Sequence, residues 1–74
     1  MRLGELVQAN KKNLDGFNFW ARKDPIHHDY WKCYVETPKG RSYWISWRSD
    51  TEPTAEEIRD TWLNPKYRRT FQPG

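Results

Sequence analysis

One tight turn constrains the fold of this chain more than any other feature. In "YVETPKGRSYWISW", residues 34–47, two alternating runs flank a Pro-Lys-Gly loop at 38–40. Proline presets the backbone of the first loop position, and glycine suits the left-handed bulge position that closes a three-residue hairpin loop. Such a loop pairs Thr37 with Arg41 and sets the register of both strands outward from the turn.

This register sorts the side chains onto two faces of a sheet. A further strand is predicted at 17–23, "FNFWARK", because its apolar and polar residues alternate. The face expected to form the core holds Phe17, Phe19, Ala21, Trp31, Cys33, Val35, Tyr43, Ile45 and Trp47. The opposite face holds Asn18, Trp20, Arg22, Tyr30, Lys32, Tyr34, Trp44, Ser46 and Arg48.

Two helices are predicted to flank these strands. Apolar residues at helical spacing predict an amphipathic helix over residues 2–13, with Gly16 as the breaker. In "PTAEEIRDTWLNP", Thr54 and Glu57 have the spacing of a capping box, and Pro65 ends the helix. The fold class expected is therefore α+β, in the order helix, three-stranded antiparallel meander, helix (α-β-β-β-α).

With 74 residues, the chain is expected to form one small domain over 1–65, followed by a basic and aromatic C-terminal tail over 66–74. Cys33 is the only cysteine, so an intramolecular disulfide is impossible. The first ten residues contain no apolar run long enough for a signal peptide or a membrane span. A cytoplasmic protein without membrane contact is the expectation.

Charge is distributed unevenly along the chain. Residues 50–60, "DTEPTAEEIRD", hold five acids and one Arg, out of totals of ten acidic and 13 basic residues. The remainder is thus basic, with 12 Lys and Arg against five acids. The segment "KYRRTFQPG" at the C-terminus has three cations and no acid. Such asymmetry is typical of an interaction surface.

The segment "DPIHHDYWKC" contains possible metal ligands in His27, His28, Asp29 and Cys33. A structural zinc site uses four ligands, usually in two pairs, and no second cluster completes this set. Catalysis by Cys33 would need a neighbouring base and a lowered pKa, whereas this residue falls on the predicted core face. No metal, no cofactor and no enzymatic activity are therefore expected.

The second face is the strongest functional signal, because aromatic rings can stack bases while neighbouring Lys and Arg neutralise phosphate. The leading hypothesis is a non-enzymatic module that contacts nucleic acid through this face and the basic tail. The alternative is a regulator or inhibitor that docks the same face on a larger protein, since Trp, Tyr and Arg also dominate protein hot spots. A third possibility is that a helix covers this face as a second small core. No small-molecule substrate is expected. The predicted partner-binding residues are Trp20, Arg22, Tyr30, Lys32, Tyr34, Trp44, Arg48, Lys66, Arg68 and Arg69.

The segment "DPIHHDYWKCYV" resembles the loop between the first two strands of double-stranded-RNA-binding domains, with Pro25, His27, Trp31 and Val35 at matching offsets. The resemblance implies the order α-β-β-β-α and makes His27 a candidate for minor-groove contact. That family opens its last helix with a Lys-rich phosphate clamp, whereas this chain has "PTAEEIRD" there. Acids at that position repel an RNA backbone, so duplex RNA binding is not expected.

Overall fold

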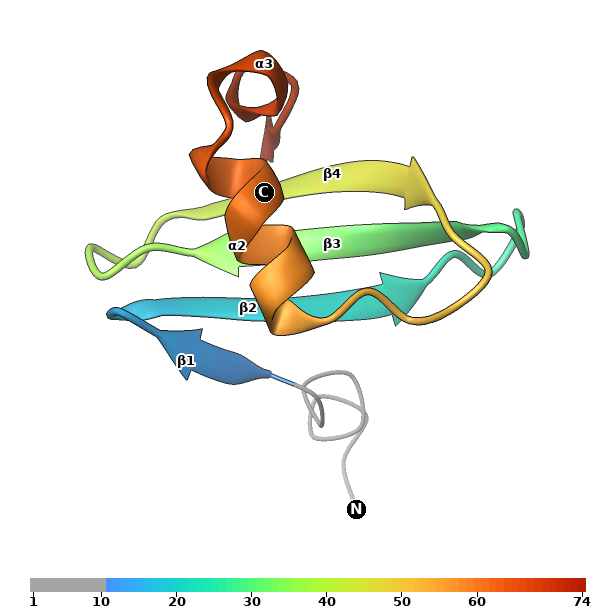
Figure 1. Ribbon diagram of the computed structural model, residues 1–74, viewed down its shortest axis with the longest axis horizontal. Helices are drawn as coiled ribbons and strands as arrows, with labels where there is room; N and C mark the ends of the chain where they lie inside the picture. The colour runs from blue at the N-terminus through green and yellow to red at the C-terminus, as the bar shows by residue number, and fades with distance from the viewer. Residues whose placement is uncertain (1–10) are drawn as a thin grey trace.

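The computed structural model describes residues 11–74, which form an antiparallel sheet with helical segments against one face (Figure 1). The elements in chain order are β1 (Lys12–Leu14), β2 (Phe17–Lys23), β3 (Tyr30–Glu36), β4 (Ser42–Arg48), α2 (Ala55–Leu63), α3 (Pro65–Arg68) and β5 (Gln72–Pro73). The five strands lie side by side in sequence order, and each is antiparallel to its neighbours.

The predicted order of helix, three strands, helix is wrong. The sheet has five strands, and within the described residues the first four strands come before the helices and β5 follows them. Of the helix predicted over 2–13, residues 2–10 lie outside the described part of the chain, whereas Lys12 and Asn13 belong to β1. The observed order also differs from the α-β-β-β-α order that the resemblance to double-stranded-RNA-binding domains implied.

The cause of this correction is the turn between β1 and β2. Asp15 and Gly16 have positive φ values of 55° and 87°, and Leu14 pairs directly with Phe17. An Asp-Gly pair with both φ values positive is what the favoured two-residue hairpin turn requires, because its twist matches that of the strands. The glycine that was interpreted as a helix breaker therefore reverses a strand.

The predicted hairpin is confirmed in its turn and in its register. Gly40 has a φ of 83°, and its amide donates to the carbonyl of Thr37 at 2.9 Å. The amide of Thr37 in turn donates to the carbonyl of Arg41 at 2.8 Å. From this closed turn the pairing of β3 with β4 follows the predicted register to its far end.

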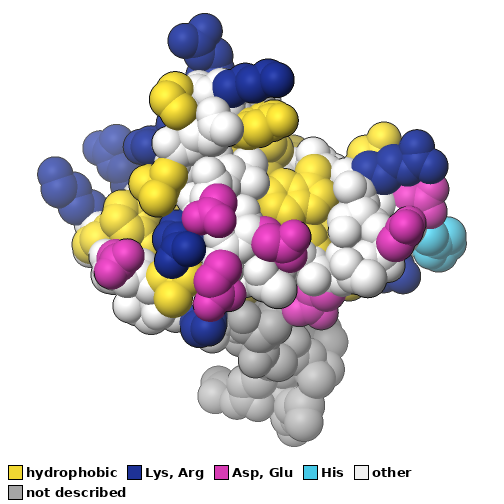
Figure 2. Space-filling model, viewed as in Figure 1, with side chains coloured by type: hydrophobic (Ala, Val, Ile, Leu, Met, Phe, Trp, Pro, Cys, Tyr) yellow, Lys and Arg dark blue, Asp and Glu magenta, His cyan; other side chains and the backbone are white. Residues whose placement is uncertain are grey.

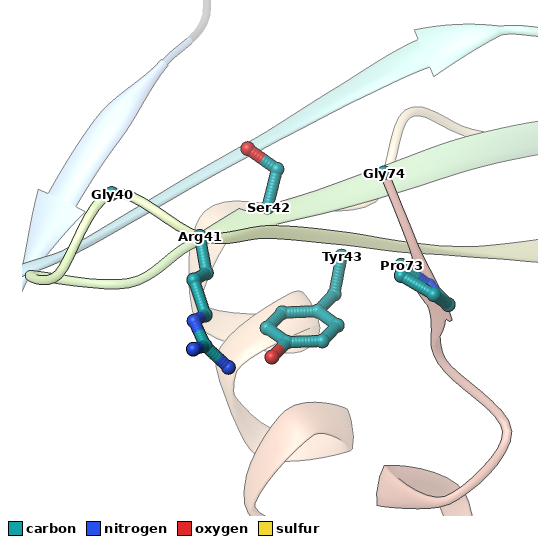
Figure 3. Close-up of a pocket in the computed structure, with 6 residues that line it drawn as sticks. All are labelled: Gly40, Arg41, Ser42, Tyr43, Pro73 and Gly74. Atoms are coloured by element: carbon teal, nitrogen blue, oxygen red, sulfur yellow. The ribbon is translucent and has the colours of Figure 1, made fainter.

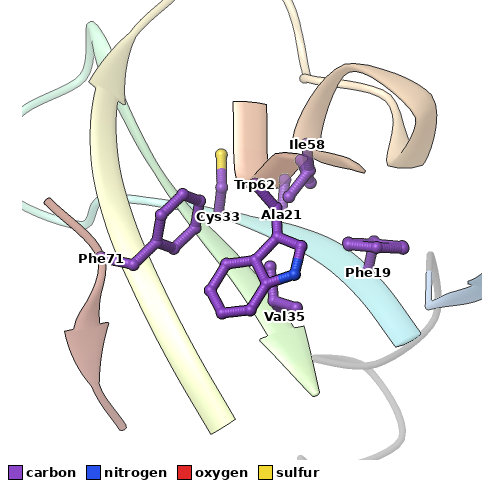
Figure 4. Packing of buried hydrophobic residues seen from close by; sticks show 7 residues of the cluster. All are labelled: Phe19, Ala21, Cys33, Val35, Ile58, Trp62 and Phe71. Atoms are coloured by element: carbon purple, nitrogen blue, oxygen red, sulfur yellow. The ribbon is translucent and has the colours of Figure 1, made fainter. Parts of the chain in front are cut away.

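The core lies between the sheet and α2. Its buried members are Phe19, Ala21, Cys33 and Val35 from the sheet, with Ile58 and Trp62 from α2 and Phe71 (Figure 4). The remaining residues of the predicted core face pack around this cluster, half-buried. The alternation of each strand thus sends one set of side chains towards α2 and the other set away from it.

Local signals place α2 over the core face. The Thr54 hydroxyl accepts from the Glu57 amide at 3.1 Å, and the Glu57 carboxylate accepts from the Thr54 amide at 2.9 Å, so the predicted capping box is confirmed. The helix ends at Leu63, directly before Asn64 and Pro65.

The last residues return to the sheet. Phe71 is 8% exposed and meets the Trp62 ring edge-to-face at a centroid distance of 5.1 Å. Beyond it, β5 pairs with β4, and the Gly74 amide donates to the Ser42 carbonyl at 2.8 Å. Within residues 11–74, no helix is both long and apolar enough to cross a membrane.

Candidate functional site

The sheet face turned away from α2 carries the residues predicted to bind a partner. We call it the aromatic face, and we define it by Lys11, Asn18, Trp20, Arg22, Tyr30, Lys32, Tyr34, Trp44, Ser46 and Arg48. Its centre is one row of rings across three strands, because Trp20 is opposite Tyr34 and Tyr34 is opposite Trp44. The Trp20 and Tyr34 rings stack at 5.1 Å with their planes 10° apart.

Two lysines lie over the tryptophans at the ends of this row. Lys11 Nζ is 4.9 Å from the centre of the Trp20 ring, and Lys32 Nζ is 5.0 Å from the centre of the Trp44 ring. At these distances the ammonium groups are attracted to the ring faces. The row of rings is therefore bordered by positive charge on both sides.

A second row adds further positive charge next to the rings. Arg22 on β2 is directly opposite Lys32 on β3, and neither side chain forms an ion pair with any residue of 11–74. Arg22 is exposed and Lys32 is half-buried. Both charges are thus available to an anion that approaches this face.

The acid on this face is neutralised within the fold. Glu36 accepts a hydrogen bond from Asn18 Nδ2 at 2.9 Å and pairs with Lys11 Nζ at 3.2 Å. These two contacts, with the Asn18 hydrogen bond the larger cause, hold the pKa of the Glu36 carboxyl below its ordinary value. Glu36 therefore stays ionised and paired near neutral pH, and it repels an approaching anion less than a free carboxylate would.

The exposure of the three rings differs, which separates their roles. Trp20 retains 9% of its accessible surface, whereas Tyr34 and Trp44 are half-buried. Tyr34 and Trp44 can therefore present ring surface to a partner, and the Trp20 ring stacks against that of Tyr34. The predicted role of Trp20 as a direct contact is less favoured by this burial.

Two further predicted residues, Tyr30 and Arg48, lie at the end of the sheet away from the β3–β4 turn. Tyr30 is 39% exposed and is directly opposite Arg48, which pairs with Asp29 at 3.6 Å. The exposed ring of His27, the residue singled out by the RNA-binding resemblance, meets the Tyr30 ring edge-on at 6.0 Å. The backbone amides of the same loop donate to Asp24 and hold the pKa of its carboxyl below the ordinary value.

The cations of the C-terminal segment are not on the aromatic face. The guanidinium carbon of Arg68 lies 3.7 Å from the centre of the Trp62 ring, which belongs to the core on the helix side. Lys66 lies over the neighbouring Tyr67 ring at 5.6 Å, and Arg69 is exposed in the turn after α3. The structure therefore divides the predicted site into two surfaces.

Sequence reasoning missed Lys11 as a member of the site. It was assigned to the predicted helix, whereas the described chain carries its ammonium onto the Trp20 ring and Glu36. The signal that could have found it is the Asp15-Gly16 pair. Interpreted as a hairpin turn, this pair places the residues before it in a strand beside β2.

The other reactive groups do not assemble into a site. Cys33 is completely buried, and burial, with a smaller contribution from the charge of Glu57, raises the pKa of its thiol to about 12. A thiol with so high a pKa is a poor nucleophile, because the thiolate is the reactive form. Among residues 11–74, no three His, Cys, Asp or Glu side chains come together in a group that could hold a metal ion.

Comparison of the chain with protein-family models, with curated proteins and with solved structures gave no match in any of the three. A functional proposal for this protein therefore depends on its own residues and their geometry.

Proposed function

We propose that this protein binds single-stranded nucleic acid without sequence preference, through the aromatic face. The observation that carries the proposal is the row of Trp20, Tyr34 and Trp44 directly beside the cationic pair Arg22 and Lys32. Unpaired bases can stack on the exposed parts of Tyr34 and Trp44, and each such contact contributes about 1–3 kcal/mol. Stacking tolerates any base, since every base has a π-face.

The distribution of acids supports binding on this side of the sheet. Figure 2 views the molecule from the helix side and shows Asp and Glu side chains at and around α2. The first turn of α2 carries Glu56 and Glu57, whose charges favour the positive end of the helix dipole. A polyanion is therefore repelled from the first turn of α2 and attracted to the aromatic face. Single strands are favoured over duplex because bases in a duplex are already stacked on each other.

A titration of intrinsic fluorescence with single-stranded and duplex oligonucleotides at several salt concentrations tests the proposal. We expect three phosphate contacts, from Arg22, Lys32 and Arg48, and each releases about 0.7 counterions from a single strand. The affinity for single strands should then fall roughly twentyfold between 50 and 200 mM salt. Trp44→Ala should remove about 1–3 kcal/mol of binding free energy. No detectable binding at the lower salt concentration would reject the proposal.

The matched control is Arg69→Gln, because Arg69 is also an exposed cation but lies in the turn after α3, away from the aromatic face. Arg22→Gln should weaken oligonucleotide binding and reduce its salt dependence, whereas Arg69→Gln should do neither. Thermal melting of each variant separates lost binding from lost folding.

A specific observation also favours the alternative, a larger protein as the partner of the same face. At the end of the sheet where Tyr30 is 39% exposed, the β2–β3 loop carries Ile26 with 77% of its surface exposed. Exposed apolar and aromatic side chains next to arginine are typical of protein hot spots. In that case, a protein captured by the full chain should be lost with Ile26→Ser and Trp44→Ala, and its affinity should depend little on salt.

A further inference from the structure

A second surface hollow lies on the helix side, between the β3–β4 turn and the helices. Its volume is about 490 Å³. We call it the cationic groove, and we define it by the rings of Phe17, Tyr43 and Trp62 and the cations Lys39, Arg41 and Arg68. Figure 2 shows Lys and Arg side chains beside hydrophobic ones at this end of the molecule, on the left. The groove shares no residue with the aromatic face, and of the residues that define it only Arg68 was predicted from the sequence to bind a partner.

The charge of the groove is not balanced within the described chain. Three cations and no acid line the hollow. None of Lys39, Arg41 and Arg68 forms an ion pair with any residue of 11–74. Like charges around one hollow raise the local potential and attract an anion from solution.

One of the cations is already held in place. The Arg68 guanidinium lies on the Trp62 ring at 3.7 Å, and Trp62 is itself only 4% exposed in the core. Arg41, directly before β4, extends in the same direction as Tyr43 (Figure 3). An adjoining hollow of about 310 Å³ is also lined by Arg41 and Tyr43. A guanidinium held by packing loses less entropy on binding, and its fork of N–H groups matches the oxygens of an oxyanion.

The number of cations favours phosphate over a single carboxylate. A phosphomonoester carries about −1.5 to −2 charges near neutral pH, whereas a carboxylate carries one. The volume of the groove and its aromatic lining favour a ligand in which a flat group is attached to the phosphate. An engineered apolar cavity of about 150 Å³ holds benzene, so the groove has room for a base and a sugar as well as the phosphate.

We propose that the cationic groove binds a nucleoside monophosphate. The phosphate lies among Lys39, Arg41 and Arg68, and the base lies against Phe17 and Tyr43. This ligand departs from the sequence analysis, in which no small-molecule substrate was expected. The proposal is independent of the proposed function, because the two surfaces share no residue.

Isothermal titration calorimetry of the full chain with adenosine monophosphate tests the proposal, with adenosine, inorganic phosphate and phenyl phosphate as comparison ligands. Adenosine monophosphate should bind at least about tenfold more tightly than adenosine, because charge-assisted hydrogen bonds to phosphate are lost without it. Its affinity should also exceed the affinities of inorganic phosphate and phenyl phosphate. Inorganic phosphate leaves the rings of Phe17 and Tyr43 uncovered, and phenyl phosphate covers them only in part.

Variants locate the binding on the protein. Arg41→Gln should weaken the affinity by about tenfold or more, and Lys39→Gln should weaken it less. Both side chains are exposed and neither forms an ion pair within 11–74, so both variants should fold. Arg68→Gln is informative only beside its melting curve, because Arg68 also packs on Trp62. Arg69→Gln, an exposed cation that belongs to neither the cationic groove nor the aromatic face, is the matched control and should leave the affinity unchanged.

Several results would overturn the proposal. Absence of heat at millimolar nucleotide, equal affinity for inorganic phosphate, or no effect of Arg41→Gln would each do so. Tighter binding of phenyl phosphate would exclude a nucleotide. A peptide that contains Glu and Leu could instead bind through Arg41 while the nucleotide does not bind. That result would show that the ligand of the groove is an acidic protein segment and not a nucleotide. Loss of oligonucleotide binding in Arg22→Gln reports on the aromatic face alone, so the two proposals fail independently.

Discussion

Cys33 shows at the scale of one residue how burial controls chemistry. Its side chain is fully buried between the sheet and α2, and burial raises the pKa of its thiol from 9.0 to about 12. Native protein at pH 8 should therefore react with a thiol reagent only as fast as the chain opens, and denatured protein should react at once. Fast stoichiometric labelling of native protein would contradict the placement of Cys33 on the core face.

The same thiol should make folding sensitive to alkali. Because the folded pKa is higher than the unfolded one, the contribution of Cys33 to stability is fully present below about pH 9 and is lost as pH rises towards 12. Denaturant titrations at pH 8 and pH 10.5 should show a smaller loss of unfolding free energy for Cys33→Ala than for the unmodified chain. Equal losses in the two proteins would show that other groups cause the alkaline decline.

Gly40 is required for its backbone conformation rather than for space. Its φ is 83°, and no atom lies within 4 Å of the position that a β-carbon would take. Gly40→Val should therefore cost about 1 kcal/mol or more through backbone strain alone, which lowers the melting temperature by about 4–8 °C for a domain of this size. Gly40→Asn is the control, because asparagine tolerates the left-handed region. Identical melting of all three proteins would contradict this turn geometry.

At the scale of elements, the start of α2 depends on reciprocal hydrogen bonds between Thr54 and Glu57. Thr54→Ala leaves the Glu57 amide without this acceptor and should reduce the unfolding free energy by about 1 kcal/mol. Chemical denaturation measures the change. Thr51→Ala, an exposed position before the helix, is the control and should change stability little. Equal effects of the two variants would show that the cap contributes nothing specific.

The two faces of β4 should respond differently to truncation. Trp47 packs against the core cluster, whereas Trp44 belongs to the aromatic face, and both rings are half-buried. Trp47→Ala should cost about 3 kcal/mol, at the lower end of the range for core tryptophans because the ring is not fully buried. Trp44→Ala should cost clearly less and should impair binding. Equal destabilisation, measured by urea denaturation, would indicate that both faces serve as cores.

At the scale of the whole molecule, the sheet separates two charged surfaces. The aromatic face carries Arg22 and Lys32, which form no ion pair within residues 11–74, and the helix side carries the acids of α2 (Figure 2). Salt screens charges more than about 10 Å apart at 0.1 M. Asp60→Asn on α2 should therefore change oligonucleotide affinity little, whereas Lys32→Gln should lower it. A gain from Asp60→Asn as large as the loss from Lys32→Gln would place the nucleic acid on the helix side.

Some of this architecture follows from the sequence because local chemistry determines it. The Pro-Lys-Gly loop at 38–40 fixes the hairpin register, and a period of two then assigns every side chain of β3 and β4 to a face. The capping box of Thr54 and Glu57 is equally local, since both partners lie within one turn of α2. The core face and the aromatic row were predictable for these reasons.

Other features were decided only by tertiary contacts. Lys12–Leu14 forms a strand because the Asp-Gly turn places it beside β2, where backbone pairing overrides a helical pattern of apolar residues. The C-terminal segment returns to the sheet because Phe71 packs against Trp62, and the two residues come from different elements. That packing places Arg68 on the helix side, where its guanidinium lies over the Trp62 ring, instead of in a separate basic tail. Local patterns specify turns, caps and alternation, whereas burial against distant residues decides which segments join the sheet and which surface each charge occupies.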